Sequence, residues 1–306
     1  MDWIVPLILT VITASTPLLL AATGELITEK SGVLNLGVEG MMLVGAISGF
    51  AVTVSSGSAI LGILAAIVAG MLMSLIFAFL TLTLMANQVA TGLALTIFGV
   101  GFSALVGSGF VGFPLDPLPS LSIPVISTIP VIGPILFSQD FLVYASIAIV
   151  IATGWFLTRT RAGLILKAVG DSHDSAHAIG YRVIRIRYMA TLFGGAMSGL
   201  GGAYLSLSYT PMWAENMTAG RGWIALALVV FATWRPGRLL AGAYMFGCIS
   251  VLQLHAQSAG VNVPSQFMSM LPYLATVIVL VIISSDYTKI RLNAPACIGK
   301  AFRPAQ

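Results

Sequence analysis

The sequence predicts an all-α polytopic membrane protein, a bundle of about 8–10 transmembrane helices with at least one short or broken helix. Of its 306 residues, 58% are hydrophobic and only 8% are charged, whereas about 25% of the residues in soluble domains are charged. Most of the chain falls into apolar runs of roughly 18 or more residues, the length that a spanning helix needs. The alternating pattern of a membrane barrel is absent. Within a bilayer, the α-helix is then the structure that can pair the backbone N–H and C=O groups with one another.

The apolar runs predict where the spans lie. In chain order, the expected spans are residues 3–23, 38–54, 59–85, 89–111, 141–158, 188–209, 223–234, 239–257 and 267–284. The first run lacks the basic segment of a secretory signal peptide, so we expect a helix of the mature protein. The run 223–234 is too short, because its charge-free core covers roughly 18 Å of a ~30 Å hydrocarbon layer. Either it extends back through Arg221 toward Met217 or it crosses only half of the membrane, and Pro236 with Gly237 ends it.

The basic residues predict how the spans are oriented. They gather in the long polar loop 159–187, in the turn after the short span and in the tail 285–306. The positive-inside rule places these three segments in the cytoplasm. Counting spans backward then puts the N-terminus and the Pro-rich loop 112–140 outside. We expect one transmembrane domain over residues 1–306. Its net charge of +4 is expected to favour contact with anionic lipid and not with nucleic acid, because the basic residues lie beside the spans.

The sequence offers little for catalysis or metal binding. A phosphate-binding GxxxxGK[ST] loop is absent, so any ATP must be handled by a partner. His173 and His177 lie four residues apart, but a third ligand is not evident, and a solvated amphipathic helix is the favoured interpretation. Cys248 and Cys297 lie in unlike surroundings and imply no disulfide or metal knuckle.

Three segments carry a family resemblance. They read "ITEKSGVLNLGVEGMMLVGA", "RAGLILKAVGDSHDSAHAIGYRVIRIRYMATLFGGAMSGLGGAYLSL" and "MTAGRGWIALALVVFATWRP". Together they resemble the signature regions of the branched-chain amino acid and ribose-type ABC importer permeases, most closely the simple-sugar and nucleoside branch. The match covers nearly the whole chain in the right order.

This resemblance implies a permease subunit in a bacterial inner membrane that moves nucleosides or related simple sugars by alternating access. A second homologous permease, making a heterodimer, would complete the pathway. A cytoplasmic ABC ATPase would hold ATP and Mg²⁺, so this chain binds no cofactor itself, and an external lipoprotein would deliver substrate. Other substrates of the family, such as ribose or branched-chain amino acids, stay open.

The resemblance also implies that segment 170–180 is the coupling helix that docks on the ATPase. Loops of this family commonly read like GENPxAAxxxG, whereas Ser172 stands here in place of the acidic residue and the histidines are unusual. The expected ATPase-coupling residues are Gly170, Asp171, Asp174, Ala178 and Gly180.

Ionisable residues cluster at the edge of the second span. Glu25, Glu29, Lys30 and Glu39 are expected to line a solvated inner mouth with local pairing, and Glu39 is the best candidate to reach a wet path. Polar and aromatic side chains in the spans suit a neutral polar ring, although hydrogen bonds between helices explain the polar ones equally well. The pathway candidates are Asn35, which could also cap the helix beyond it, Glu39, Asn87, Gln88, Thr91, Phe98, Phe102 and Arg221.

Two other classes of protein compete with an ABC permease. A secondary transporter driven by H⁺ or Na⁺ would need acids or unwound carbonyl-rich sites inside the membrane, and the middle of the spans is almost free of Asp and Glu. A membrane-embedded enzyme would need reactive groups at one depth, but the three histidines are divided between the 159–187 loop and the far end of a span.

Overall fold

The computed structural model describes residues 4–121, 133, 137–258, 264–284 and 293–303. Most of the Pro-rich loop, at 122–132 and 134–136, and the start of the tail, at 285–292, lie outside the described residues. The described chain is helical, and its six helices that are long and apolar enough to cross a membrane make it a multi-pass membrane protein. The predicted fold class is confirmed.

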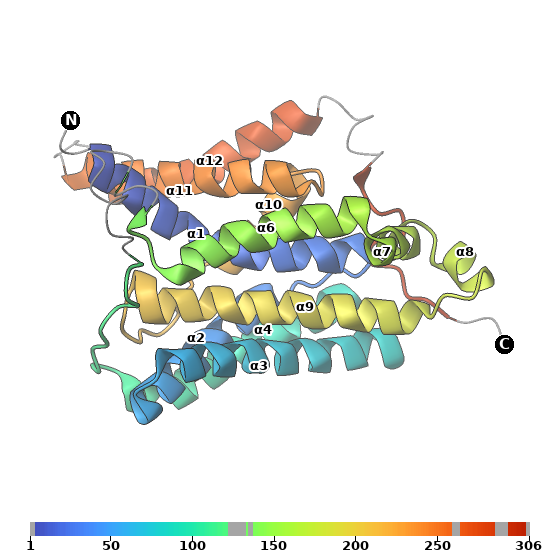
Figure 1. Ribbon diagram of the computed structural model, residues 1–306, viewed down its shortest axis with the longest axis horizontal. Coiled ribbons are helices and arrows are strands. Elements are labelled where there is room, and N and C mark those ends of the chain that lie inside the picture. The colour runs from blue at the N-terminus through green and yellow to red at the C-terminus, as the bar shows by residue number, and fades with distance from the viewer. Residues whose placement is uncertain (1–3, 122–132, 134–136, 259–263, 285–292, 304–306) are drawn as a thin grey trace.

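Most of the helices run side by side along one direction and form a single bundle (Figure 1). Helices α3 and α9 each continue into a short π-helical segment, Phe79–Thr83 after α3 and Leu205–Tyr209 after α9. Their bounds are α1 Ile4–Lys30, α2 Val38–Ser56, α3 Ala59–Ala78, α4 Gln88–Gly107, α6 Phe141–Arg159, α7 Arg161–Asp171, α8 His173–Ala178, α9 Val183–Tyr204, α10 Arg221–Phe231, α11 Pro236–Ser258 and α12 Ser265–Ser284.

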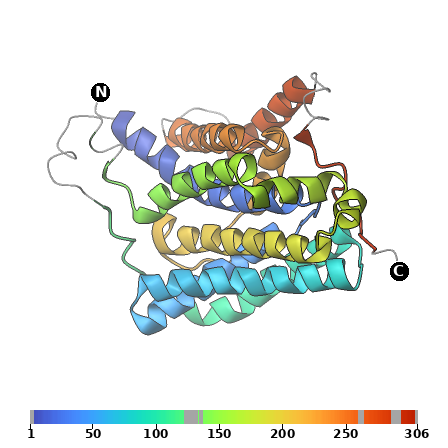
Figure 2. The same cartoon turned by 45° about the vertical axis from the view of Figure 1, so that its right-hand side comes forward.

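Helix α9 occupies the centre of the bundle, between α1 and α6 on one side and α2 and α3 on the other (Figures 1 and 2). Small residues allow this close packing. A Cβ atom on Gly199 would fall against the Ala66 carbonyl of α3, and one on Gly195 would fall against the Gly70 carbonyl. The Gly195/Gly199 pair is therefore a helix-packing motif, which is the role that the sequence favoured.

The span predicted to be short is short in the structure. Helix α10 has 11 residues and starts at Arg221, so it does not extend back to Met217. It ends at Phe231, and the next turn places Thr233 and Trp234 at φ of 49° and 53°, in the left-handed region that few side chains adopt. Pro236 then begins α11, where its missing N–H costs no helical bond.

At one end of the bundle, α7 lies across the direction of the spans and is seen almost end-on, with α8 beyond it (Figure 1). The tail segment, residues 293–303, returns along this end. Its Cys297 N–H donates to the Gly170 carbonyl at 2.9 Å and its Gly299 N–H to the Gly32 carbonyl at 3.1 Å. The tail therefore packs against the connection from α7 to α8 and against the loop that follows α1.

Candidate functional site

Glu39, at the start of α2, holds the start of the short helix α10. The residue is only 4% exposed. Oε1 accepts from the Thr218 hydroxyl at 2.5 Å and from the Gly220 N–H at 2.8 Å, and Oε2 accepts from the Gly222 N–H at 2.5 Å. Free N–H groups at a helix N-terminus attract negative charge, so three donors and the helix dipole stabilise this buried anion. Glu39 thus joins α2 to α10.

Arg221 lies beside this contact, but its guanidinium has hydrogen-bond acceptors of its own. Its Nη1 donates to the carbonyls of Met217 at 3.2 Å and Thr218 at 3.3 Å. The guanidinium also lies 5.4 Å from the centre of the Tyr209 ring, a cation–π distance. Of the pathway candidates, Glu39 and Arg221 are therefore brought together, through Thr218, at the start of α10.

A second carboxylate holds the other end of α10. Glu29 of α1 accepts a hydrogen bond from the indole N–H of Trp234 at 2.6 Å, in the turn that follows α10. Glu25, one turn earlier, accepts the Asn35 N–H at 3.2 Å. Glu25 is fully buried and Glu29 is 1% exposed. The expectation of a solvated mouth is therefore wrong, since these acids are packed inside the bundle.

Asn35 shapes the loop between α1 and α2. Its Oδ1 accepts the Gly37 N–H at 2.9 Å. Gly37 itself is the residue before α2, and α2 has no side-chain cap. Asn35 thus tightens the turn that leads into α2 without capping that helix.

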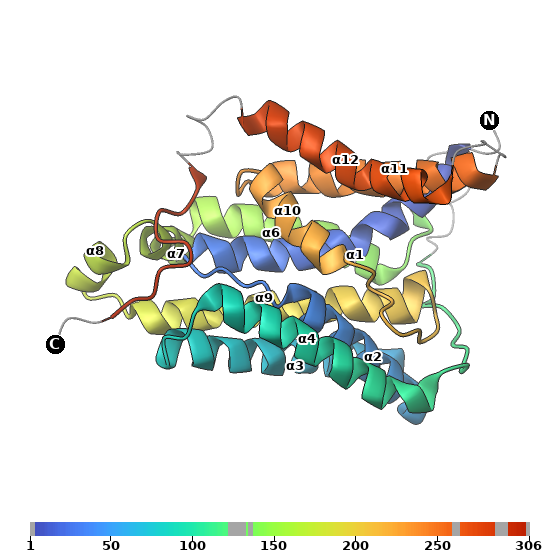
Figure 3. The same ribbon diagram turned by 180° about the vertical axis from the view of Figure 1, so that it is seen from behind.

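The remaining pathway candidates lie in α4 or, for Asn87, directly before it. Asn87 caps this helix by accepting the Ala90 N–H at 3.0 Å, and Gln88 accepts the Leu34 N–H at 2.8 Å. Thr91 is half-buried. Phe98 and Phe102 stack with ring centres 5.8 Å apart and are 52% and 39% exposed. The aromatic pair therefore lies on the outer face of α4, which is at the front in Figure 3.

The five coupling candidates divide into a packed part and an exposed part. Gly170 is buried, and a Cβ there would fall against the Lys30 carbonyl. Ser172 caps α8 by accepting the Ser175 N–H at 3.3 Å. Gly180 ends the segment with φ of 94°. The residues on the exposed side are Asp171, Asp174, Ala178 and Gly180.

A buried arginine, which the sequence did not single out, fixes this end of the bundle. Arg187 of α9 is 1% exposed. It donates from Nε to the Ser31 carbonyl at 3.1 Å and from Nη1 to the Lys300 carbonyl at 2.9 Å, and its Nη2 lies 3.2 Å from His173 Nδ1. One side chain therefore joins the end of α1, the tail segment, α8 and α9.

His173 is part of this cluster, and with Ala176 it makes the buried side of α8, while the other side is exposed, as in the amphipathic helix that the sequence favours. Burial and then the charge of Arg187 lower the pKa of His173. The neutral ring that results can accept from Arg187 through Nδ1. The ring of Phe302, in the tail segment, lies 5.2 Å from that of His173 and 5.3 Å from that of His177. Within the described residues, no group of three or more His, Cys, Asp or Glu could hold a metal ion.

The family described as the permease component of the branched-chain amino acid transport system matches residues 7–283. The chain belongs to this family. It is 40% identical over 311 residues to a Haloferax volcanii protein provisionally named a glucose ABC transporter permease protein, with 94% of each chain covered. It is 32% identical over 282 residues to the guanosine ABC transporter permease protein of Bacillus subtilis, covering 87% of this chain and 88% of that protein.

A third relative, the nucleoside ABC transporter permease protein of Lactococcus lactis, is 29% identical over 280 residues, with 87% and 88% coverage. No solved structure matches the chain. The resemblance predicted from the three sequence segments is confirmed, and the chain is a permease of the simple-sugar and nucleoside branch.

Proposed function

We propose that this chain forms one half of the translocation pathway of an ABC importer for nucleosides or related simple sugars. The relatives named for guanosine, nucleosides and glucose support this class of substrate. The chain contributes no ATPase of its own, because it lacks a phosphate-binding loop. ATP and Mg²⁺ belong to the cytoplasmic partner.

The observation that carries the proposal is the packing of α8, which contacts the bundle on one side and is exposed on the other. Asp174 and Ala178 face outward at the end of the bundle, while His173, on the opposite side of α8, contacts Phe302 and Arg187. Arg187 belongs to the central helix α9, so a push on α8 is transmitted directly to the spans. An ATPase that docks on the exposed side can therefore shift the equilibrium between inward-open and outward-open states, provided that it binds the two states with different affinity.

The pathway itself requires a second chain. Phe98 and Phe102 are exposed on α4, so in the proposed assembly they face the pathway between this chain and a homologous permease, together with Thr91. Glu39 and Arg221 lie at the break before α10, a place where transporters bind substrate with irregular backbone. A neutral, hydroxyl-rich ring fits this lining, because the lining offers aromatic surfaces for stacking and few fixed charges.

The orientation follows from the same assignment. The α7–α8 end faces the cytoplasm, as does the tail segment, and the N-terminus and the loop 112–140 face outward. An extracytoplasmic lipoprotein then delivers substrate at the end opposite α8. The membrane is the bacterial cytoplasmic membrane.

The test is uptake by vesicles that carry the whole importer, with labelled uridine, adenosine, glucose, ribose and a branched-chain amino acid offered separately. We expect ATP-dependent accumulation of a nucleoside or a simple sugar. Accumulation of the amino acid alone would overturn the substrate class. Uptake that persists without the ATPase, driven by an ion gradient, would overturn the ABC mechanism in favour of a secondary transporter.

A further inference from the structure

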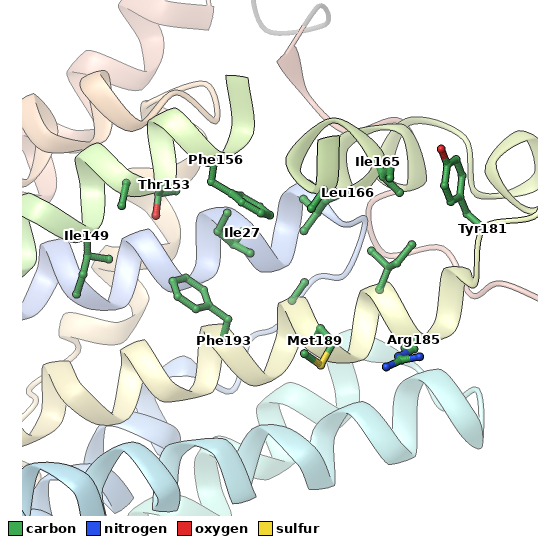
Figure 4. A pocket seen from close by; sticks show the side chains of 14 residues that line it. Ile27, Ile149, Thr153, Phe156, Ile165, Leu166, Tyr181, Arg185, Met189 and Phe193 are labelled. Atoms are coloured by element: carbon green, nitrogen blue, oxygen red, sulfur yellow. The ribbon is translucent and has the colours of Figure 1, made fainter. Parts of the chain in front are cut away.

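A cavity of about 600 Å³ lies between α1, α6, α7 and α9 (Figure 4). Its walls are almost entirely apolar, with Ile149 and Phe156 from α6, Ile165 from α7, and Met189 and Phe193 from α9. A sugar or nucleoside would lose its hydrogen bonds to water there without replacement. The cavity is therefore separate from the proposed pathway and suits a hydrocarbon chain.

Polar groups are present at one end of this cavity. Tyr181 and Arg185 lie at the end nearest α8, and Ile149 lies at the other (Figure 4). Both side chains are exposed, and neither has a hydrogen bond or an ion pair with the described part of the protein. Arg185 is the single charged residue of the described lining. The cavity thus combines an apolar body with a cationic entrance.

The position of α7 places this entrance at the level of lipid headgroups. Helix α7 crosses the direction of the spans (Figure 1), Leu166 is buried, and Leu164 on the outside is 50% exposed. A helix of this kind lies in the membrane interface with apolar residues toward the acyl chains. Basic pockets between spanning helices on the cytoplasmic side bind anionic headgroups.

We propose that this cavity is a phospholipid site, with one acyl chain between α6 and α9 and an anionic headgroup on Arg185 and Tyr181. The guanidinium donates to the phosphate, and the Tyr181 hydroxyl adds a second donor. Arg185, the one cation among the described lining residues, favours a lipid with net negative charge over a zwitterionic one. The bound lipid fills the space between α6 and the central helix α9.

Native mass spectrometry of the full-length protein tests this proposal, with phosphatidylglycerol, phosphatidylcholine and chain-free glycerol phosphate as probes. Arg185→Gln should weaken phosphatidylglycerol binding about fivefold, the factor for one basic residue near an anionic surface. Arg182→Gln is the matched control, because Arg182 is also exposed but does not line the cavity. Phosphatidylcholine should bind more weakly, and Arg185→Gln should weaken it by a smaller factor, because its ammonium group offsets the charge of the phosphate.

Filling the cavity provides the second arm of the test. Ala152→Phe, on the α6 wall, should abolish the lipid adduct while the protein keeps its melting temperature in detergent. If Ala152→Phe does not fold, the surface variant Arg185→Gln still decides the matter. Equal phosphatidylglycerol binding by the Arg185 and Arg182 variants would overturn the proposal. So would binding of glycerol phosphate as tight as that of the intact lipid, since the acyl chain would then contribute nothing.

Discussion

Two buried charges, Glu39 and Arg187, stabilise opposite parts of this protein by related means. Both are almost fully buried, and neither forms a salt bridge within the described residues. Glu39 is bound by a hydroxyl and two backbone N–H groups at the start of α10, whereas Arg187 is bound by two backbone carbonyls and an imidazole. In each case the backbone supplies the opposite partial charge.

The difference lies in what each charge connects. Glu39 stabilises a break inside a membrane span, where a helix must begin within the bundle. Arg187 joins the ends of separate elements, among them the tail segment more than 100 positions away in the chain. The first contact therefore maintains the irregular backbone of the proposed pathway, and the second holds the proposed coupling helix to the bundle. Variants at the two sites should have different consequences.

The largest effect is expected from Glu39→Ala. It leaves the N–H groups of Gly220 and Gly222 and the Thr218 hydroxyl without an acceptor in a buried place, at a cost of about 3 kcal/mol or more. We expect a large fall in the melting temperature of the detergent-purified protein and loss of uptake. Glu39→Gln keeps one acceptor oxygen and should lose less. Equal melting temperatures for the Ala and Gln variants would show that the N–H contacts do not matter.

Arg187→Lys should come next. A lysine keeps the charge, but its single nitrogen cannot reach the carbonyls of Ser31 and Lys300 and the His173 ring together. We expect a loss of stability of about 2 kcal/mol and faster amide exchange in α8 and the tail segment. Arg182→Lys, at the exposed arginine that directly precedes α9, is the control. If both variants exchange alike, Arg187 does not anchor α8.

Phe302→Ala should have a smaller and more local effect. The ring is 6% exposed and fills the space beside His173 and His177, so its removal should cost about 1–2 kcal/mol. Hydrogen exchange should increase in α8 and remain unchanged in α3. Phe302→Leu should retain most of the protection. An increase in α3 of the same size would indicate a global effect instead of a local one.

The smallest effect is expected from pH. Because the folded state lowers the pKa of His173, the unfolded state binds a proton first as the pH falls below about 6.5. The contribution of His173 is therefore present above that pH and is lost as the pH falls through the lower folded pKa. We expect tail protection measured by hydrogen exchange to decrease over this range, and His173→Asn to remove the dependence. A decrease that persists in the Asn variant would assign it to other groups.

The sequence predicts those parts of the fold that depend on local signals. Apolar runs define the spans, and Pro236 with Gly237 marks the end of the short one, because a helix break is a property of neighbouring residues. Asn87 also carries a local signal, since Asn is a preferred residue before a helix. The capping contact of Asn87 could have been read from the sequence alone.

The buried charges could not be predicted in the same way. Glu39 bonds to Thr218, which is 179 positions away, and Glu29 to Trp234, which is 205 positions away. Nothing near the acids in the sequence indicates that α10 and the turn after it will cover them, so the sequence alone favours a solvated mouth. The sequence places Arg187 among the basic residues of the 159–187 loop, and nothing near it indicates that its partners come from the end of α1, from α8 and from the tail.

The most direct test of the account is the contact between α8 and the ATPase. A photo-crosslinking amino acid at Ala178, on the exposed side of α8, should form an adduct with the ATPase subunit in the assembled importer. The same amino acid at Ser56, the exposed last residue of α2, should not, because the end of α2 lies at the other end of the bundle (Figure 1). An ATPase adduct from position 56 with none from position 178 would contradict both the coupling role of α8 and the orientation of the chain.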